Sequence, residues 1–300
     1  MRASLANGIE IEYDVHGDGE PLLLIMGLGG QLVAWPLEFV HRMVGCGFKV
    51  IRFDNRDIGL STKIAAPVPN RRQLVAAVAR RRWAHAPYLI SDMADDTAGL
   101  LDHLGVASAH VVGVSMGGMI AQALTIGHPE RVSSLTSIMS NTGDRTHGRV
   151  HPRLLSRLAR LVTGPPDDAI ANNVEILRLI SGPHFDLGET RRLVEEEHGR
   201  NYDPDGGSRQ TMAIIASPDR TWDLRRVTVP TLVIHGLLDR LVMPSGGVAT
   251  TKAIPGSRLL MYPDMAHDLP RPRWDEIIDE IVTNTRRAET GGAATERAAV

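Results

Sequence analysis

The sequence predicts an α/β fold, with a mostly parallel sheet flanked by helices and a helical insertion before the last strands. Short apolar runs rich in β-branched residues alternate with helical patterns over residues 1–140 and again over residues 227–288. This alternation is typical of a parallel sheet covered on both faces. Residues 141–226, called the insertion below, show helical periodicity alone. With 300 residues, of which 43% are hydrophobic, we expect one large α/β domain carrying the insertion as a cap, or lid; two small domains are the alternative.

Apolar, β-branched runs mark the strands of the first part. We expect them at residues 2–6, 9–15, 21–26, 48–53, 109–112 and 132–139. Asn7-Gly8 separates the first two and is a strong signal for a two-residue antiparallel hairpin. The unbroken apolar run at residues 21–26 is typical of a buried parallel strand. Helices are expected at residues 36–44, 92–104 and 116–124.

The same signals divide the rest of the chain. Helices of the insertion are expected at residues 154–162, 170–180, 189–198 and 212–216, with glycine and proline at the joins. After the insertion we expect strands at residues 229–235 and 258–262 and helices at residues 244–253 and 271–285. Residues 289–300 are small, polar and without pattern, which predicts a disordered tail.

Composition and charge exclude several classes of protein. A formal charge of −2, from 33 basic and 35 acidic residues, gives no global attraction for nucleic acid. Cys46 is the only cysteine, so no internal disulfide can form and a cytoplasmic location is expected. Residues 1–7 lack the apolar core of a signal peptide, and no run approaches the roughly 20 apolar residues that span a bilayer. The sequence leaves the oligomeric state open.

The motif Gly113-Val114-Ser115-Met116-Gly117 lies between an expected strand and an expected helix. In that setting G-x-S-x-G forms a nucleophile elbow, with the serine on a strained turn. Glycine is needed at both ends because a Cβ there would collide with the neighbouring strand or helix. The pattern alone is weak, since chance produces it in about one chain in ten of this length. The alternative is an ordinary turn bracketed by glycines.

A serine hydroxyl becomes a nucleophile when a base takes its proton and a carboxylate orients that base. Asp239 and His267 each follow an expected strand of the second part, where the carboxyl ends of parallel strands meet. The alternatives are that Asp239 caps the next helix and that His267 is a solvated loop histidine. Asp264 and Asp268 are further candidate acids, but they lie beside His267 on one loop and are poorly placed to orient its ring.

Acyl transfer also needs donors for the oxyanion that develops on the carbonyl oxygen. Met116 supplies one backbone N–H, and the loop Gly27-Leu28-Gly29-Gly30 supplies another, for which Leu28 is the candidate. The same glycines also suit a simple turn with positive φ. A phosphate site is less well supported, because neither a P-loop lysine nor G-x-G-x-x-G is present. We expect no cofactor and no metal.

The chain resembles α/β-hydrolase-fold serine hydrolases over residues 1–288. The resemblance is carried by Met26-Gly27-Leu28-Gly29-Gly30, by Arg52-Phe53-Asp54-Asn55-Arg56-Asp57-Ile58-Gly59-Leu60-Ser61, by the elbow, and by Asp239 and His267. The chain is most similar to small bacterial carboxylesterases and lipases, including the aclacinomycin methylesterase type. The resemblance implies that Ser115 is acylated, that His267 shuttles protons and that Asp239 orients His267. It also implies that residues 52–61 support the site. Met26 departs from the family pattern, because many members have histidine there.

The insertion is rich in leucine and isoleucine and contains Phe185, which predicts an apolar small-molecule ester, thioester or lipid as substrate. These residues also suit simple packing on the core. A lactonase or perhydrolase uses the same triad, and some proteins of this fold only bind small molecules, so both functions stay open. Carbon–carbon bond hydrolases match less well, because they usually carry a proline in the first glycine loop, and this chain does not.

Residues 70–88 form a separate basic segment. It contains Arg71, Arg72, Arg80, Arg81 and Arg82, with apolar residues between them. If helical, the segment has a basic amphipathic surface that suits weak contact with anionic lipid or an acidic substrate. The simpler alternative is a solvated, arginine-rich face.

Overall fold

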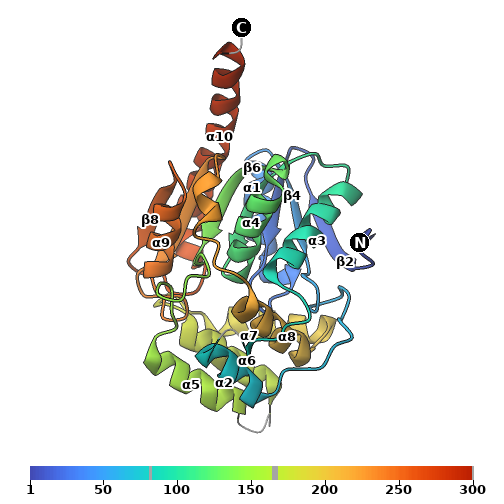
Figure 1. Ribbon diagram of the computed structural model, residues 1–300, viewed down its shortest axis with the longest axis vertical. Helices are drawn as coiled ribbons and strands as arrows, with labels where there is room; N and C mark the ends of the chain where they lie inside the picture. The colour runs from blue at the N-terminus through green and yellow to red at the C-terminus, as the bar shows by residue number, and fades with distance from the viewer. Residues whose placement is uncertain (81–82, 164–167, 299–300) are drawn as a thin grey trace.

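Eight strands form one sheet in the order β1-β2-β4-β3-β5-β6-β7-β8 (Figure 1). The strands are β1 Arg2–Ser4, β2 Glu10–His16, β3 Glu20–Ile25, β4 Phe48–Phe53, β5 Ala109–Val114, β6 Val132–Ile138, β7 Thr231–Gly236 and β8 Arg258–Tyr262. β2 pairs with β1 and β4 in antiparallel fashion, and all other pairs are parallel. The computed structural model describes residues 1–80, 83–163 and 168–298. At residues 71, 79, 159–163 and 289–298 it describes the backbone alone.

Helices cover both faces of the sheet because the strand side chains alternate between two cores. In β3, Leu23 and Ile25 belong to one apolar cluster, while Leu22 and Leu24 belong to the other. The first cluster includes residues of α3 (Ile90–His103), α4 (Met116–Gly127) and α9 (Ser245–Ala253). The second includes residues of α1 (Leu37–Gly45) and α10 (Trp274–Ala298). The expected α/β architecture is therefore confirmed.

The insertion connects β6 to β7 and holds four helices. These are α5 Pro152–Thr163, α6 Ala169–Ile180, α7 Leu187–Arg200 and α8 Pro204–Ala216. They gather at one end of the sheet, together with α2 (Arg71–Ala79) from the segment after β4 (Figure 1). α2 begins at a capping box in which Asn70 accepts the N–H of Gln73. No helix among the described residues is both long and apolar enough to traverse a lipid bilayer.

Two helices extend beyond the residues expected for them. α8 begins at Pro204 rather than at residue 212, because Asp203 caps it and Pro204 occupies its first turn. Its Gly206 lies so close to the core that a Cβ there would be 2.1 Å from the Asp57 carbonyl oxygen. The backbone of α10 continues to Ala298, through residues for which we predicted a disordered tail. Residues 289–298 contain three alanines, the residue with the highest helix propensity, together with two glycines, whose helix propensity is low.

Candidate active site

Ser115 occupies the turn between β5 and α4, with φ 55° and ψ −118°. This backbone conformation is strained for a residue that carries a side chain. Close packing requires the two flanking glycines. A Cβ on Gly113 would lie 2.2 Å from the Gly117 carbonyl oxygen, and a Cβ on Gly117 would lie 2.1 Å from the carbonyl oxygen of Ile25. The turn therefore has the geometry of a nucleophile elbow.

His267 lies in the loop after β8, with its ring between Ser115 and Asp239. Nε2 is 2.9 Å from Ser115 Oγ, and Nδ1 is 2.7 Å from Asp239 Oδ2. When Nδ1–H donates to the carboxylate, Nε2 presents its lone pair to the serine hydroxyl. The His267 backbone N–H donates to the carbonyl oxygen of Ile180, at the end of α6, at 2.9 Å. The insertion therefore helps to fix the loop that carries the ring.

Asp239 follows β7 and is buried, with 2% of its surface exposed. Its Oδ1 accepts the backbone N–H groups two and three residues further on, each at 2.8 Å, which leaves Oδ2 for His267. Burial acts to raise the pKa of this carboxyl, but His267 and the nearby His235 outweigh it and lower the pKa to about 2. Asp239 is therefore ionised at neutral pH. It does not cap α9, whose N-cap is Pro244.

The other candidate acids are engaged away from the His267 ring. Asp264 forms an ion pair with Arg273 and accepts a hydrogen bond from His184 at 2.7 Å. Asp268 accepts the backbone N–H of Gly182 at 3.1 Å. Asp239 is thus the carboxylate that the fold brings to Nδ1 of His267.

Two backbone amides next to the serine are available to an oxyanion. The glycine loop passes over Ser115, since a Cβ on Gly27 would lie 3.2 Å from the serine Cβ. Within the described parts of the chain, neither the Leu28 N–H nor the Met116 N–H has a hydrogen-bond partner. Unpaired N–H groups at the start of a helix and in a glycine loop suit a developing negative charge.

The structure adds polar residues that the sequence analysis did not single out. They surround the glycine loop and are Gln31, Glu197, Arg200 and Gln210. Arg200 forms an ion pair at 3.0 Å with Asp54, and Asp54 accepts the Leu32 N–H at 2.6 Å. Asp54 belongs to a motif that carries the family resemblance. The four newly identified polar residues had no local sequence pattern that marked them, because their hydrogen-bond partners lie far away in the sequence.

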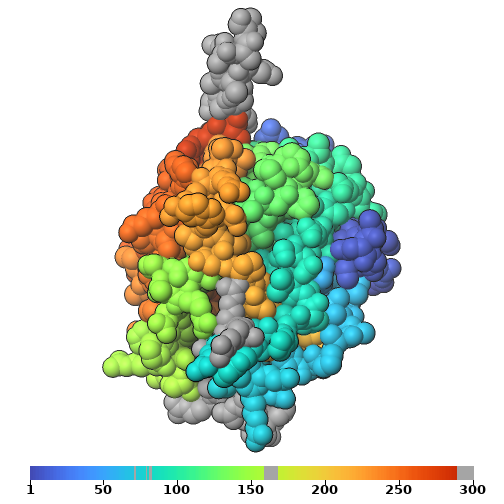
Figure 2. Space-filling view, in the orientation of Figure 1, coloured from blue at the N-terminus to red at the C-terminus, as the bar shows by residue number. Residues whose placement is uncertain are grey.

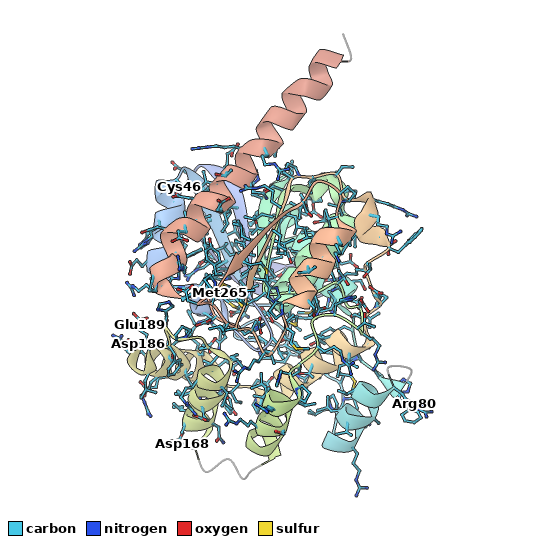
Figure 3. All side chains as sticks on the ribbon, turned by 90° about the vertical axis from the view of Figure 1, so that its left-hand side faces the viewer. Cys46, Arg80, Asp168, Asp186, Glu189 and Met265 are labelled. Atoms are coloured by element: carbon cyan, nitrogen blue, oxygen red, sulfur yellow. The ribbon has the colours of Figure 1, made fainter. Side chains whose placement is uncertain are left out.

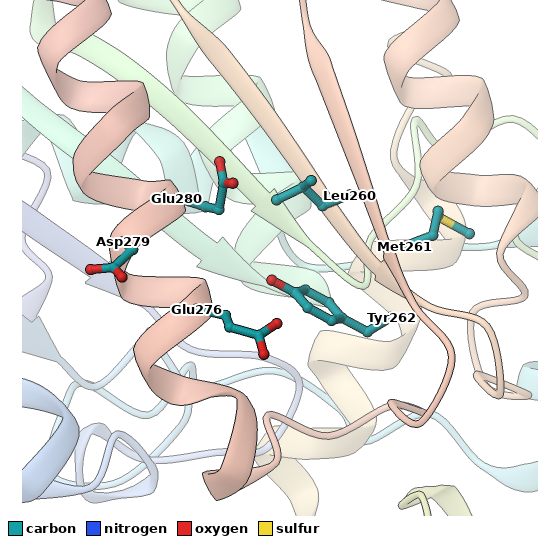
Figure 4. A pocket seen from close by; sticks show the side chains of 6 residues that line it. All are labelled: Leu260, Met261, Tyr262, Glu276, Asp279 and Glu280. Atoms are coloured by element: carbon teal, nitrogen blue, oxygen red, sulfur yellow. The ribbon is translucent and has the colours of Figure 1, made fainter.

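A cavity of 370 Å³ lies between β8 and α10 (Figure 4). Its walls are formed by Leu260, Met261, Tyr262, Glu276, Asp279 and Glu280. None of the candidate site residues lines it. Met265, two residues before His267, lies instead where the sheet meets the insertion (Figure 3). The cavity is therefore separate from the Ser115 site.

Comparison with known proteins assigns the family. A profile for the alpha/beta hydrolase fold matches residues 20–270. Rhodomycin D methylesterase DnrP of Streptomyces peucetius is 31% identical over 291 residues, covering 89% of this chain and 91% of the relative. The enol-lactonase from Burkholderia xenovorans LB400 has a similar structure, with a TM-score of 0.72, 23% identity, and coverage of 95% of this chain and 99% of the enzyme.

The match to the family profile includes the glycine loop, the elbow and both loops that carry the partners of Ser115. The methylesterase similarity extends over most of both chains, whereas the lactonase similarity concerns the fold alone. From these matches, this chain belongs to the α/β-hydrolase-fold family.

Proposed function

We propose that the protein is a serine hydrolase that cleaves carboxylic esters of apolar small molecules or lipids, with thioesters as related substrates. The observation that carries the proposal is the continuous hydrogen-bonded path from Ser115 Oγ through His267 to Asp239, with steps of 2.9 Å and 2.7 Å. Such a path supplies the nucleophile, the base and the orienting carboxylate that acyl transfer needs. Similarity to a protein named as a methylesterase supports the choice of esters.

In the proposed reaction, His267 Nε2 takes the proton of Ser115 as Oγ attacks the ester carbonyl carbon. The carbonyl oxygen becomes an oxyanion, which accepts hydrogen bonds from the Leu28 and Met116 amides. The C–O bond to the alcohol then breaks, and His267 returns its proton to the departing alkoxide. Water then attacks the acyl carbon as His267 takes its proton. The bond between that carbon and Ser115 Oγ breaks, the acid leaves, and His267 returns the proton to Oγ. Asp239 holds the ring orientation and stabilises its positive charge.

The surroundings of the serine favour an apolar substrate. Leu28 is 44% exposed, and Leu237 and Leu238, just before Asp239, are 50% and 46% exposed. These side chains belong to the loops that carry a proposed oxyanion donor and the proposed orienting acid. We propose that the insertion acts as a lid over them, and that its own apolar side chains complete the pocket.

The free, exposed thiol of Cys46 favours a cytoplasmic location.

The test is hydrolysis of short- and medium-chain p-nitrophenyl esters, together with labelling by a fluorophosphonate. We expect turnover, and labelling at Ser115 that the Ser115→Ala variant lacks. Parallel assays with lactones and with peracid formation distinguish the two enzymes that would use the same triad. A well-folded protein that shows neither turnover nor labelling would instead favour the small-molecule-binding alternative.

We further propose that the exposed side chains of α2 and of the residues just after it, called the α2 surface below (Arg72, Val75, Val78, Arg80 and Trp83), make weak contact with anionic lipid. The chain has no carboxylate between Asp57 and Asp92, although this stretch includes one lysine and five arginines. On α2, Val75 and Val78 are 62% and 54% exposed, and Trp83 nearby is 46% exposed. Exposed apolar groups beside cations suit a phospholipid surface.

The structure describes the side chains of only some arginines of this basic segment. Arg72 and Arg80 are described and exposed, and the Arg80 guanidinium lies 5.0 Å from the Trp83 ring centroid. Arg80 lies near the outer end of the α2 segment in Figure 3, and this segment forms part of the surface seen in Figure 2. The expectation for Arg81 and Arg82 falls outside the described residues, as does that for the Arg71 side chain.

A further inference from the structure

Gln210 of α8 reaches from the insertion to the glycine loop. Its Oε1 accepts the N–H of Gly29 at 3.0 Å, and its Nε2 donates to the carbonyl oxygen of Arg56 at 3.0 Å. The residue is completely buried, so neither end has water as a substitute partner. A buried amide with both ends paired has a well-defined orientation. Gln210 therefore joins the glycine loop to the turn after β4.

Gln31, directly after the loop, is held by α7. Its N–H donates to Glu197 Oε1 at 2.9 Å, and its Nε2 donates to the carbonyl oxygens of Glu197 and Asn201, both at 2.8 Å. Arg200 donates to Gln31 Oε1 at 2.5 Å and also pairs with Asp54. The insertion thus contacts the loop on both sides of Gly30.

Most backbone amides of residues 28–32, in and directly after the glycine loop, are occupied by hydrogen bonds. The Gly29 and Gln31 amides donate to side chains of the insertion. The Gly30 amide donates to the Gly27 carbonyl oxygen at 3.3 Å, and the Leu32 amide donates to Asp54. Over residues 28–32 of the described chain, only the Leu28 N–H lacks a partner. Gly29 has φ +75°, a conformation that glycine adopts without strain.

We propose that Gln210 is a positioning residue for the oxyanion hole, acting through Gly29 to aim the Leu28 N–H. This inference rests on the proposed serine hydrolase function. Because peptide groups are planar, the hydrogen bond of the Gly29 N–H fixes the plane of the Leu28–Gly29 peptide. The peptide that carries the Leu28 N–H is joined directly to this fixed plane at the Leu28 Cα. The insertion then has two roles, since it forms the pocket and also sets the geometry of the catalytic amide. If Gln210 only ties the insertion to the core, its loss will lower stability without changing the chemical step.

The test compares Gln210→Met with Asn284→Leu. Asn284 is a matched control, because it is also fully buried and its Nδ2 donates to the carbonyl oxygen of Leu135 at 3.0 Å, from α10. We expect both variants to have a lower Tm. Only Gln210→Met is expected to lower kcat, by about 10-fold or more with little change in KM, because the lost contact acts in the transition state. It should weaken inhibition by an alkylboronic acid, which forms a tetrahedral adduct with serine, by a similar factor.

Amide hydrogen exchange provides a measurement that does not depend on activity. We expect faster exchange in the peptide covering residues 24–32 in Gln210→Met and no change there in Asn284→Leu. Unchanged exchange, or a kcat equal to wild type in an active enzyme, overturns the positioning role. An inactive, unlabelled wild type contradicts the proposed function instead, and exchange then still decides whether the insertion holds the loop. If Gln210→Met does not fold, Gln210→Asn takes its place, because its shorter side chain stays polar but withdraws the acceptor from the Gly29 N–H, and the same outcomes apply.

Discussion

Oδ2 of Asp239 lies 2.7 Å from Nδ1 of His267, while Oδ1 of the same carboxylate accepts two backbone N–H groups at 2.8 Å each. One oxygen therefore anchors the side chain and the other meets the ring. His235 lies on the buried side, with Nε2 3.5 Å from Oδ2, and donates to the carbonyl oxygen of Val242 at 2.7 Å. Because the two oxygens have different partners, a substitution can alter one contact and keep the other.

Asp239→Asn uses this division. The amide oxygen can still accept the two backbone N–H groups, but the amide nitrogen then faces Nδ1 as a donor and favours the wrong tautomer of His267. We expect kcat for p-nitrophenyl esters to fall by about 10⁴ with only a modest loss of Tm. Asp264→Asn, on the loop that carries His267, is the control and should retain most of the activity. Similar losses in both variants would argue against an orienting role for Asp239.

Glu197 predicts a pH dependence of stability. Burial, together with nearby Asp54, raises the pKa of its carboxyl to about 7, although the Gln31 N–H and Arg200 act to lower it. The native state therefore binds more protons than the unfolded state between about pH 4.5 and pH 7, and this contribution to stability falls as pH rises. Glu197→Gln keeps an acceptor for the Gln31 N–H and removes the titration.

In denaturant titrations at pH 5 and pH 8, we expect Glu197→Gln to lose less stability than wild type, by about 2 kcal/mol. Glu195→Gln, at an exposed position of the same helix, is the matched control and should behave like wild type. Asp239 contributes with the opposite sign, because its lowered pKa stabilises the fold above about pH 4 and this stability is lost toward pH 2. If Glu197→Gln and wild type respond equally to pH, the assignment to Glu197 is wrong.

Backbone strain at Ser115 predicts different stabilities for two inactive variants. Ser115→Ala keeps a side chain at φ 55°, whereas Ser115→Gly relieves the strain. Relief of about 1–3 kcal/mol exceeds the roughly 0.5–1 kcal/mol that glycine loses through its more flexible unfolded state. We expect Ser115→Gly to be the more stable of the two by about 1 kcal/mol in chemical unfolding, and kcat to fall by several orders of magnitude in both. A more stable Ser115→Ala would contradict the strain argument.

The α2 surface predicts binding to phosphatidylglycerol vesicles in preference to phosphatidylcholine vesicles. Flotation should show this preference at low salt and its loss at 0.5 M NaCl, because salt screens exposed charges. Trp83→Ala is expected to weaken binding. Trp222→Ala is the matched control, since Trp222 is 64% exposed and also lies against an arginine, Arg225. Equal flotation with both lipids would contradict the proposed contact.

The sequence was sufficient to predict the elbow because the constraint is local. At positions 113 and 117 any Cβ would lie within 2.2 Å and 2.1 Å of a backbone oxygen. Only glycine fits there, so the motif in the sequence follows directly from the packing of the turn. The structure brings Asp239 and His267 together, and the convergence of the carboxyl ends of parallel strands is the reason that both could be singled out in the sequence. Gln210 was missed, since its partner Gly29 is 181 residues away and a glutamine within a helix has no distinctive pattern. The start of α8 does have a local signal, because Asp203 is a favourable N-cap residue and Pro204 suits the first turn of a helix.

The hydrogen bond between Gln210 and Gly29 also bears on how enzymes of this shape can be recombined. If specificity alone resided in the insertion, exchanging residues 141–226 for those of a relative would transplant substrate preference onto an unchanged catalyst. Here the exchanged segment would also remove the acceptors for the amides of Gly29 and Gln31. A chimera would therefore need a replacement acceptor for each of these two amides. Without them, a loss of activity could not be attributed to the substrate preference of the new pocket.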